Sequence, residues 1–152
     1  MSSIKAKPRR NVKTIITLTL LIVILGVGAW LYITAKPPQE ITWLTDLDDS
    51  LGQASIQNKY VLIDFYAEWC PPCAKMDSYV YTNSNVIDFL SKHFICVKIN
   101  IDKQPQLARK FEIKFIPTTV ILNYEGEELG RIIGYRDPDT YIAEIKNILS
   151  KA

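Results

Sequence analysis

Trp69-Cys70-Pro71-Pro72-Cys73 is the segment that most constrains how this 152-residue chain folds. It follows the apolar run Tyr60 to Ala67, which predicts a buried strand. Two thiols separated by two residues come together easily on a helical turn, so a helix is expected from Cys70 to about Tyr79. A thiolate at the start of a helix is stabilised by free N–H groups and partial positive charge. Cys70 is therefore the predicted nucleophile, and Cys73 the thiol that resolves a mixed disulfide.

Cysteine usage favours a working redox pair. Three cysteines are too few for a disulfide scaffold. Outside the cytosol a close cysteine pair forms either a structural disulfide or a redox couple. A structural disulfide across so short a loop removes little conformational entropy from the unfolded chain, which favours the redox couple.

The N-terminal region is predicted to anchor the chain in a membrane. No charged residue occurs from Thr14 to Ala35. At roughly 1.5 Å per residue this run spans about 33 Å, enough for a bilayer core of about 30 Å. Trp30 and Tyr32 fall at its far end, where aromatic side chains favour the interface. The residues before the run are basic, with no acid among them: Lys5, Lys7, Arg9, Arg10 and Lys13.

The positive-inside rule predicts a single-pass protein of the bacterial inner membrane with its C-terminal domain on the periplasmic side. The alternative is a cleaved secretory signal with Val27-Gly28-Ala29 as the cleavage site. Both interpretations export the domain. We therefore expect a cytoplasmic basic tail over 1–13, an anchor over 14–35, a linker over 36–42 and one domain over 43–152.

Charge is divided unevenly along the chain. Six of the 18 Lys and Arg residues lie at or before Lys36, whereas all 16 acidic residues follow it. The exported part therefore carries 12 basic and 16 acidic residues, a net charge near −4. This pattern does not resemble a nucleic-acid-binding surface, and no nucleic-acid partner is expected.

Hydrophobic patterning predicts an α/β domain. Helical spacing runs from Trp43 to Asn58, and strands, short helices and a hairpin at Tyr124-Glu125-Gly126 follow. The order helix-strand-helix-strand-helix-strand-strand-helix implies a mixed central sheet flanked by helices. The expected later elements are a helix capped by Asn83 or Ser84, a strand over 94–101, a helix over 104–111, strands over 118–123 and 127–133, and a helix after Pro138.

Four motifs in order resemble those of the thioredoxin superfamily, over roughly Trp43 to Ala152. They are the stretch 61–73 with its cysteine pair, Val97 to Asp102, Phe115-Ile-Pro-Thr118, and Gly134. The run 75–86 is more similar to one subgroup, which includes the exported C-terminal domain of the bacterial thiol:disulfide interchange reductase. The resemblance implies a thioredoxin-like fold and a Cys70–Cys73 disulfide.

Asp64 lies in the middle of an apolar strand, so its carboxyl must be paired or shifted in pKa. By resemblance, Asp64 is buried beneath the disulfide and accepts the proton of Cys73, with Lys98 on the neighbouring strand as its partner. Burial would raise the pKa of Asp64 and Lys98 would lower it. The alternative is a surface pair on a half-exposed sheet.

The resemblance also implies substrate-binding roles for Trp69, Ile116 and Pro117. Pro117 would be cis and pack against the disulfide, which leaves the preceding backbone free to pair with an extended substrate. The alternatives are a trans proline at the start of a strand, and generic packing of Trp69.

Cys96 is expected to be an inert core residue rather than a third redox thiol. The spacing of Cys70-x-x-Cys73 and His93-x-x-Cys96 also approximates a four-ligand zinc site. The strand-like run around Cys96 argues against that alternative, and we expect no metal or organic cofactor. Haem attachment would need histidine at residue 74, which is alanine.

Together these features predict a membrane-tethered, monomeric thiol:disulfide oxidoreductase that reduces protein disulfides. The disulfide that forms in an exported reductase must be reduced again after each cycle, so a membrane electron-donating partner is implied. A disulfide oxidase, a disulfide isomerase, and a copper or haem-apoprotein chaperone that uses the same thiols are the alternatives.

Overall fold

A computed structural model of the chain describes residues 11–34 and 40–151. These residues belong to two units, Met1–Pro38 and Gln39–Ala152. Most of the predicted basic tail and of the predicted linker lies outside the described residues. In the first unit, helix α1 covers Val12–Thr34. Among the residues that the structure describes, no helix is long and apolar enough to cross a membrane.

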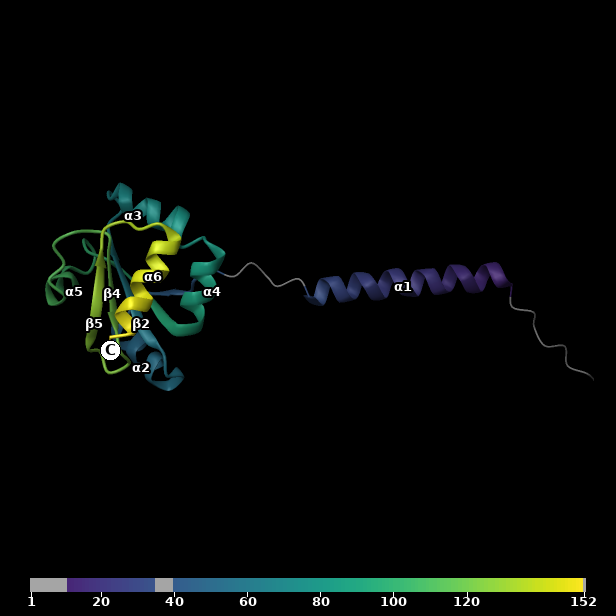
Figure 1. Cartoon of the computed structure of the whole chain (residues 1–152), viewed down its shortest axis with the longest axis horizontal. Coiled ribbons are helices and arrows are strands. Elements are labelled where there is room, and N and C mark those ends of the chain that lie inside the picture. Colours follow the sequence, from purple (N-terminus) through teal and green to yellow (C-terminus); the bar gives the residue numbers. More distant parts are fainter. Residues whose placement is uncertain (1–10, 35–39, 152) are drawn as a thin grey trace, which may run out of the picture. The chain divides into compact units, whose positions relative to one another are not determined.

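The second unit is built on a five-stranded mixed sheet in the order β1-β3-β2-β4-β5 (Figure 1). Strands β1 and β2 run parallel to β3, whereas β4 runs antiparallel to both β2 and β5. The predicted mixed sheet is confirmed. The strands are β1 (Trp43–Leu44), β2 (Tyr60–Tyr66), β3 (Phe94–Asn100), β4 (Thr118–Leu122) and β5 (Glu128–Ile133).

Helices cover both faces of this sheet. They are α2 (Leu47–Gln57), α3 (Pro71–Lys75), the π-helix η1 (Met76–Val80), α4 (Ser84–His93), α5 (Pro105–Lys110) and α6 (Pro138–Leu149). One core cluster joins the sheet to η1, α4 and α6, and the other joins it to α2 and the end of α5.

The two clusters divide the residues of β2 by the alternation of side chains along a strand. Val61, Ile63 and Phe65 belong to the cluster on the α2 side. Leu62 packs with Met76 and other residues of the opposite cluster. Asp64 lies two residues beyond Leu62, so its carboxyl faces the layer that contains the α3–η1 helix.

The helix expected from Trp43 to Asn58 begins later than predicted. Trp43 and Leu44 instead pair with Cys96 and Val97 as an edge strand. The helix starts only after Asp46, whose side chain accepts a hydrogen bond from the N–H of Asp49 at 2.9 Å. The cap and the strand pairing both override the helical spacing of the apolar residues.

The helix expected from Cys70 to Tyr79 changes type after Lys75. The N–H of Tyr81 donates to the carbonyl of Met76, five residues earlier, at 2.9 Å. This wider turn lets residues five apart share a face. Met76, Val80 and Tyr81 are consequently all buried in the same cluster.

Candidate active site

Cys70 and Cys73 form a disulfide at the start of α3. Cys70 is the N-cap residue, and its Sγ accepts a hydrogen bond from the N–H of Cys73 at 3.2 Å. Pro71 and Pro72 occupy the first helical positions, where a missing N–H costs no helical hydrogen bond. The cap position gives Cys70 the contact that stabilises a thiolate after reduction.

Exposure does not separate the two cysteines. In the disulfide form, Cys70 is 4% exposed and Cys73 is 2% exposed. What distinguishes the two sulfur atoms is the backbone donor at Cys70.

The loop before β4 lies against the disulfide. The Ile116–Pro117 peptide bond is cis. Ile116 packs against the small cluster of Ala67, Cys70 and Cys73. The Thr118 hydroxyl donates to the Phe115 carbonyl at 2.7 Å, and the Gly134 N–H donates to the Pro117 carbonyl at 2.7 Å. The first bond closes the loop on itself, and the second ties it to the residue after β5.

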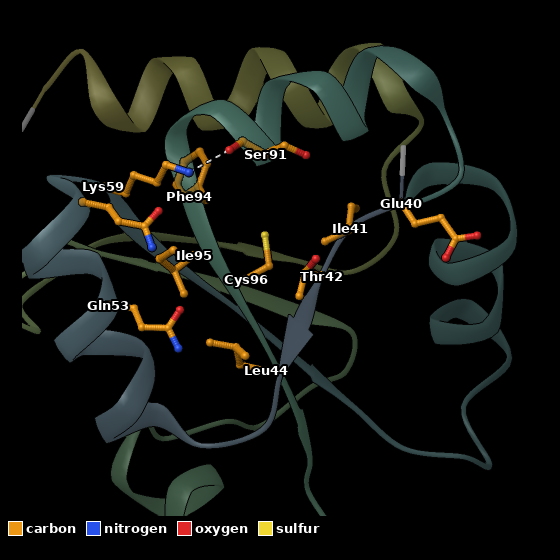
Figure 2. Close-up of a pocket in the computed structure, with 11 residues that line it drawn as sticks. Glu40, Ile41, Thr42, Leu44, Gln53, Lys59, Ser91, Phe94, Ile95 and Cys96 are labelled. Atoms are coloured by element: carbon orange, nitrogen blue, oxygen red, sulfur yellow. Dashed lines mark hydrogen bonds between the residues drawn. The ribbon is translucent and has the colours of Figure 1, made fainter. Parts of the chain in front are cut away.

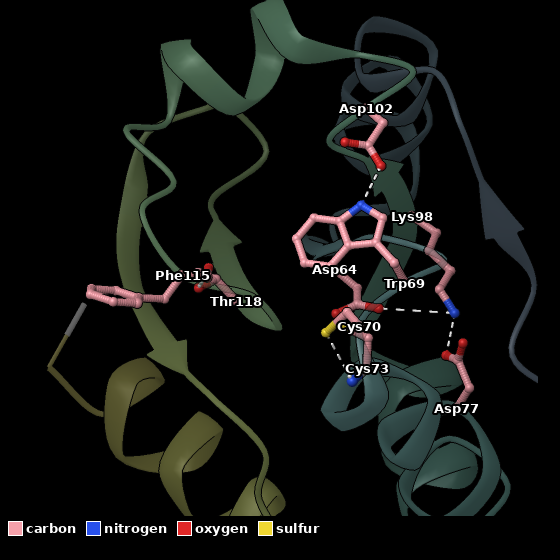
Figure 3. Close-up of a disulfide and its surroundings, with 9 residues drawn as sticks. All are labelled: Asp64, Trp69, Cys70, Cys73, Asp77, Lys98, Asp102, Phe115 and Thr118. Carbon is pink, nitrogen blue, oxygen red and sulfur yellow. Dashed lines mark hydrogen bonds and ion pairs between the residues drawn. A yellow bond between two sulfur atoms is a disulfide. The ribbon is translucent and has the colours of Figure 1, made fainter.

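Trp69 is exposed beside the disulfide, with 66% of its surface accessible. Its indole N–H donates to Asp102 Oδ2 at 2.8 Å (Figure 3). Asp102 lies just beyond β3, in a turn where the Asn100 side chain accepts a hydrogen bond from the Asp102 N–H at 2.9 Å. Sequence reasoning assigned no role to Asp102, because only the fold brings it to the indole.

Between the two tyrosines at the ends of β2, Asp64 is the one ionisable residue, and it is 1% exposed. Burial raises the pKa of its carboxyl to about 7, while the charge of Lys98 lowers the pKa and that of Asp77 raises it. Among the residues that the structure describes, none forms a hydrogen bond with the Oδ1 atom. Such a carboxyl can accept and release a proton near neutral pH.

Lys98 is the strand neighbour of Asp64 in the register of β2 and β3, and its Nζ lies 4.0 Å from Asp64 Oδ2. The same ammonium forms a closer ion pair with Asp77 of η1, so it lies between two carboxylates (Figure 3). It also lies over the Tyr66 ring, 4.8 Å from the centroid. The sequence prediction named Lys98 but missed Asp77, whose only signal was an acid one helical turn after Cys73.

Cys96 lines a separate cavity of about 280 Å³, together with residues of β3, α2 and α4 (Figure 2). The Lys59 ammonium at this cavity donates to the Ser91 carbonyl at 2.9 Å. Burial raises the pKa of the Cys96 thiol to about 12, so the thiol stays protonated and unreactive.

The zinc spacing does not form a metal centre. Cys70 and Cys73 are joined to each other, and Cys96 is buried in β3. Over the described parts of the chain, no group of three His, Cys, Asp or Glu side chains could hold a metal ion.

Comparison with known proteins gives two kinds of relative. The chain is 31% identical over 114 residues to the thiol:disulfide interchange protein DsbD of Pseudoalteromonas atlantica, which matches 70% of this chain but only 19% of that protein. It is 34% identical over 91 residues to the thioredoxin of Chlamydia trachomatis, covering 58% of this chain and 81% of that one. A solved thioredoxin from Thermus thermophilus aligns with a TM-score of 0.66 at 25% identity, over 73% of this chain and 89% of the other.

The fold, the helix-capping cysteine pair and these similarities define a thiol–disulfide oxidoreductase with a redox-active Cys-x-x-Cys disulfide. The family model for the thioredoxin-like domain matches residues 47–149. The chain therefore belongs to the thioredoxin-like domain family.

Proposed function

We propose that this chain is a membrane-tethered reductase of disulfides in exported proteins. The Cys70 thiolate attacks one sulfur of a substrate disulfide, and the other substrate sulfur leaves and takes up a proton. Cys73 then passes its proton to Asp64 and attacks Cys70 Sγ, which closes the Cys70–Cys73 bond and releases the second substrate sulfur as a thiolate. Solvent protonates this thiolate, and Asp64 returns its proton to solvent. Two electrons pass from the dithiol to the substrate in each cycle.

The observation that supports a reductase rather than an oxidase is the small number of hydrogen-bond donors available to Cys70 Sγ. The N–H of Cys73 donates to this sulfur. Pro71 and Pro72 have no N–H, and no histidine lies between the cysteines to add a positive charge. A less stabilised thiolate means a less stabilised reduced form, and therefore a more negative reduction potential.

Equilibration of the full-length protein with glutathione buffers tests this direction. We expect a potential nearer the approximate −270 mV of thioredoxin than the approximate −120 mV of a strong oxidant. Pro72→His adds a donor and a charge beside Cys70, so its potential should be less negative by about 30 mV or more. A wild-type value above about −180 mV would favour an oxidase or an isomerase.

Trp69, Ile116 and Pro117 are proposed to contact the substrate around the disulfide. The Trp69 indole is exposed and held by Asp102, and Ile116 packs directly on the cysteine cluster. An extended substrate segment between them would present its disulfide to Cys70. This arrangement supports protein substrates rather than a small molecule in a closed pocket.

Membrane attachment rests on the N-terminal sequence. The uncharged run from Thr14 to Ala35 follows a basic tail. In the described part of α1, the apolar side chains from Ile15 to Val27 are exposed, as expected of a helix that lipid covers. We propose an inner-membrane protein with its domain in the periplasm, recharged by a membrane electron donor, acting as a monomer and without a metal or organic cofactor.

Reporter fusions after Ala152 test the proposed topology. A reporter that is active only outside the cytoplasm should work at this junction, and membrane extraction should require detergent rather than salt. Activity of a reporter confined to the cytoplasm would contradict the export of the domain. A mature form that begins near Trp30 would replace the anchor with a cleaved signal.

A further inference from the structure

Three buried hydroxyl groups lie in the apolar layer on the same side of the sheet as Asp64. Tyr81 follows η1, Tyr141 belongs to α6 and Thr119 belongs to β4. The Tyr81 and Tyr141 hydroxyl oxygens are 3.4 Å apart, and the Tyr141 and Thr119 hydroxyl oxygens are 3.0 Å apart. Burying a hydroxyl in an apolar layer costs free energy unless the hydroxyl is hydrogen-bonded. These three hydroxyls meet that requirement through one another, which links them into one chain of contacts.

The chain of hydroxyls lies on the same face of the sheet as Asp64. Thr119 is the register partner of Asp64 on β4, so both side chains point to the same face of the sheet. At the other end, a hydrogen-bond interaction with Tyr81 lowers the pKa of Asp64. The carboxyl also has an Oδ1 atom without a partner in the described structure.

Counting protons shows that one of the three hydroxyls keeps a proton for a further acceptor. Each of the three hydroxyls has one proton to donate. The Thr119–Tyr141 and Tyr141–Tyr81 contacts use two of these protons. When Asp64 is ionised, it can only accept hydrogen bonds. In the order in which Thr119 donates to Tyr141 and Tyr141 donates to Tyr81, the remaining proton is that of Tyr81, which can then be donated to the carboxylate.

We propose that Tyr81 is a positioning residue for proton transfer, which donates to ionised Asp64 while Tyr141 and Thr119 orient its hydroxyl. The proposal rests on the proposed function, in which Asp64 accepts the proton of Cys73. Donation by Tyr81 stabilises the carboxylate against the cost of burial and so keeps Asp64 able to accept a proton near neutral pH.

Other groups also act on Asp64. Lys98 of β3 lowers its pKa and Asp77 of η1 raises it. Cys96 of β3 and Tyr141 interact electrostatically with it, and burial keeps both of these groups protonated at neutral pH. In Tyr81→Phe these groups are unchanged, and the ring that packs on Trp43 at 4.9 Å is retained. The variant therefore removes the Tyr81 hydroxyl, with its contact to Tyr141, and keeps the ring.

The test uses the full-length protein and two readings. The first is the pKa of the Asp64 carboxyl by NMR in the oxidised form, in which the two active-site cysteines do not titrate. The second is the pH dependence of mixed-disulfide resolution in single turnover. Tyr81→Phe should raise both midpoints by roughly one pH unit, the size of a hydrogen bond to a charged group. Resolution at pH 7 should then slow about fivefold, because the ionised fraction falls from about one half to about one tenth.

Matched variants complete the test. Tyr141→Phe should move both midpoints in the same direction but less, because Tyr141 acts through Tyr81. Tyr60→Phe, at the start of β2 and packed on Phe94, should move neither. In the Asp64→Asn background, Tyr81→Phe should have no further effect on resolution.

Two results would overturn the proposal: an Asp64 pKa unchanged in Tyr81→Phe, or a raised pKa with an unmoved resolution profile. A different result marks failure of the proposed function itself. If Asp64→Asn resolves mixed disulfides with the wild-type pH profile, Asp64 is not the proton acceptor. Tyr81 then has no role in catalysis, even if Tyr81→Phe shifts the Asp64 pKa measured by NMR.

Discussion

The Lys98 ammonium lies 4.0 Å from Asp64 Oδ2, on the strand adjacent to that carboxylate. The separation is long for an ion pair because Asp77 binds the same ammonium more closely. Lys98 therefore compensates only part of the cost of burying Asp64, and the pKa of Asp64 stays at about 7. The balance between these charges sets the acid–base behaviour of the site.

Asp64→Asn is expected to stabilise the fold at neutral and alkaline pH. The pKa of Asp64 rises from an ordinary 3.8 to about 7 on folding. The folded chain thus binds more protons between these values, and stability falls as the pH rises through this window. The variant should gain up to about 4 kcal/mol at pH 8 and nothing below the unfolded-state pKa. Denaturant unfolding at several pH values measures this, with exposed Asp48→Asn as the control; an equal gain at pH 3.5 would contradict it.

Asp77→Asn should lower the pKa of Asp64. The change removes a neighbouring negative charge and leaves Lys98 free to pair with Asp64. The acid-side midpoint of mixed-disulfide resolution should consequently move to lower pH, opposite to the shift expected for Tyr81→Phe. Single-turnover kinetics across pH 5 to 9, roughly two units either side of neutral, measures the change. A shift to higher pH would show that Asp77 stabilises the carboxylate by another route.

The two cysteines should differ in what they trap. Cys73→Ser leaves Cys70 able to attack but unable to resolve, so mixed disulfides with substrates should accumulate. Cys70→Ser should trap nothing, because the backbone donor serves the Cys70 sulfur. Non-reducing electrophoresis after acid quenching measures the adducts. Trapping through Cys73 alone would reverse the assignment.

Asp102→Ala should weaken substrate binding through Trp69. The indole loses its acceptor at 2.8 Å and samples other orientations. We expect KM for a protein disulfide to rise about two- to tenfold, as for a single hydrogen bond, with kcat nearly unchanged. Because Asp102 lies in an exposed turn, the free energy of unfolding should change by less than about 0.5 kcal/mol. Asp102→Asn keeps an acceptor and serves as the control; an equal loss in both variants would assign the effect to charge.

Local features of the chain determined much of the site. A cysteine pair after an apolar strand predicts a helix capped by Cys70, because capping and proline placement are properties of a few adjacent residues. Asp64 stood out for a similar reason, since an acid within an apolar strand must be compensated. The family resemblance added Lys98, which the strand register places beside Asp64.

The tertiary structure alone decided the charge balance and the hydroxyl chain. The widened turn of η1 directs Tyr81 into the core and places Asp77 on Lys98, which a regular helical period does not predict. Tyr141 reaches Thr119 and Tyr81 from a helix about sixty residues further along the chain than Tyr81. Such contacts depend on how α6 packs across the sheet, and no local pattern encodes which hydroxyls meet. The cysteine chemistry is thus local in sequence, whereas the proton chemistry of Asp64 arises from packing between distant elements.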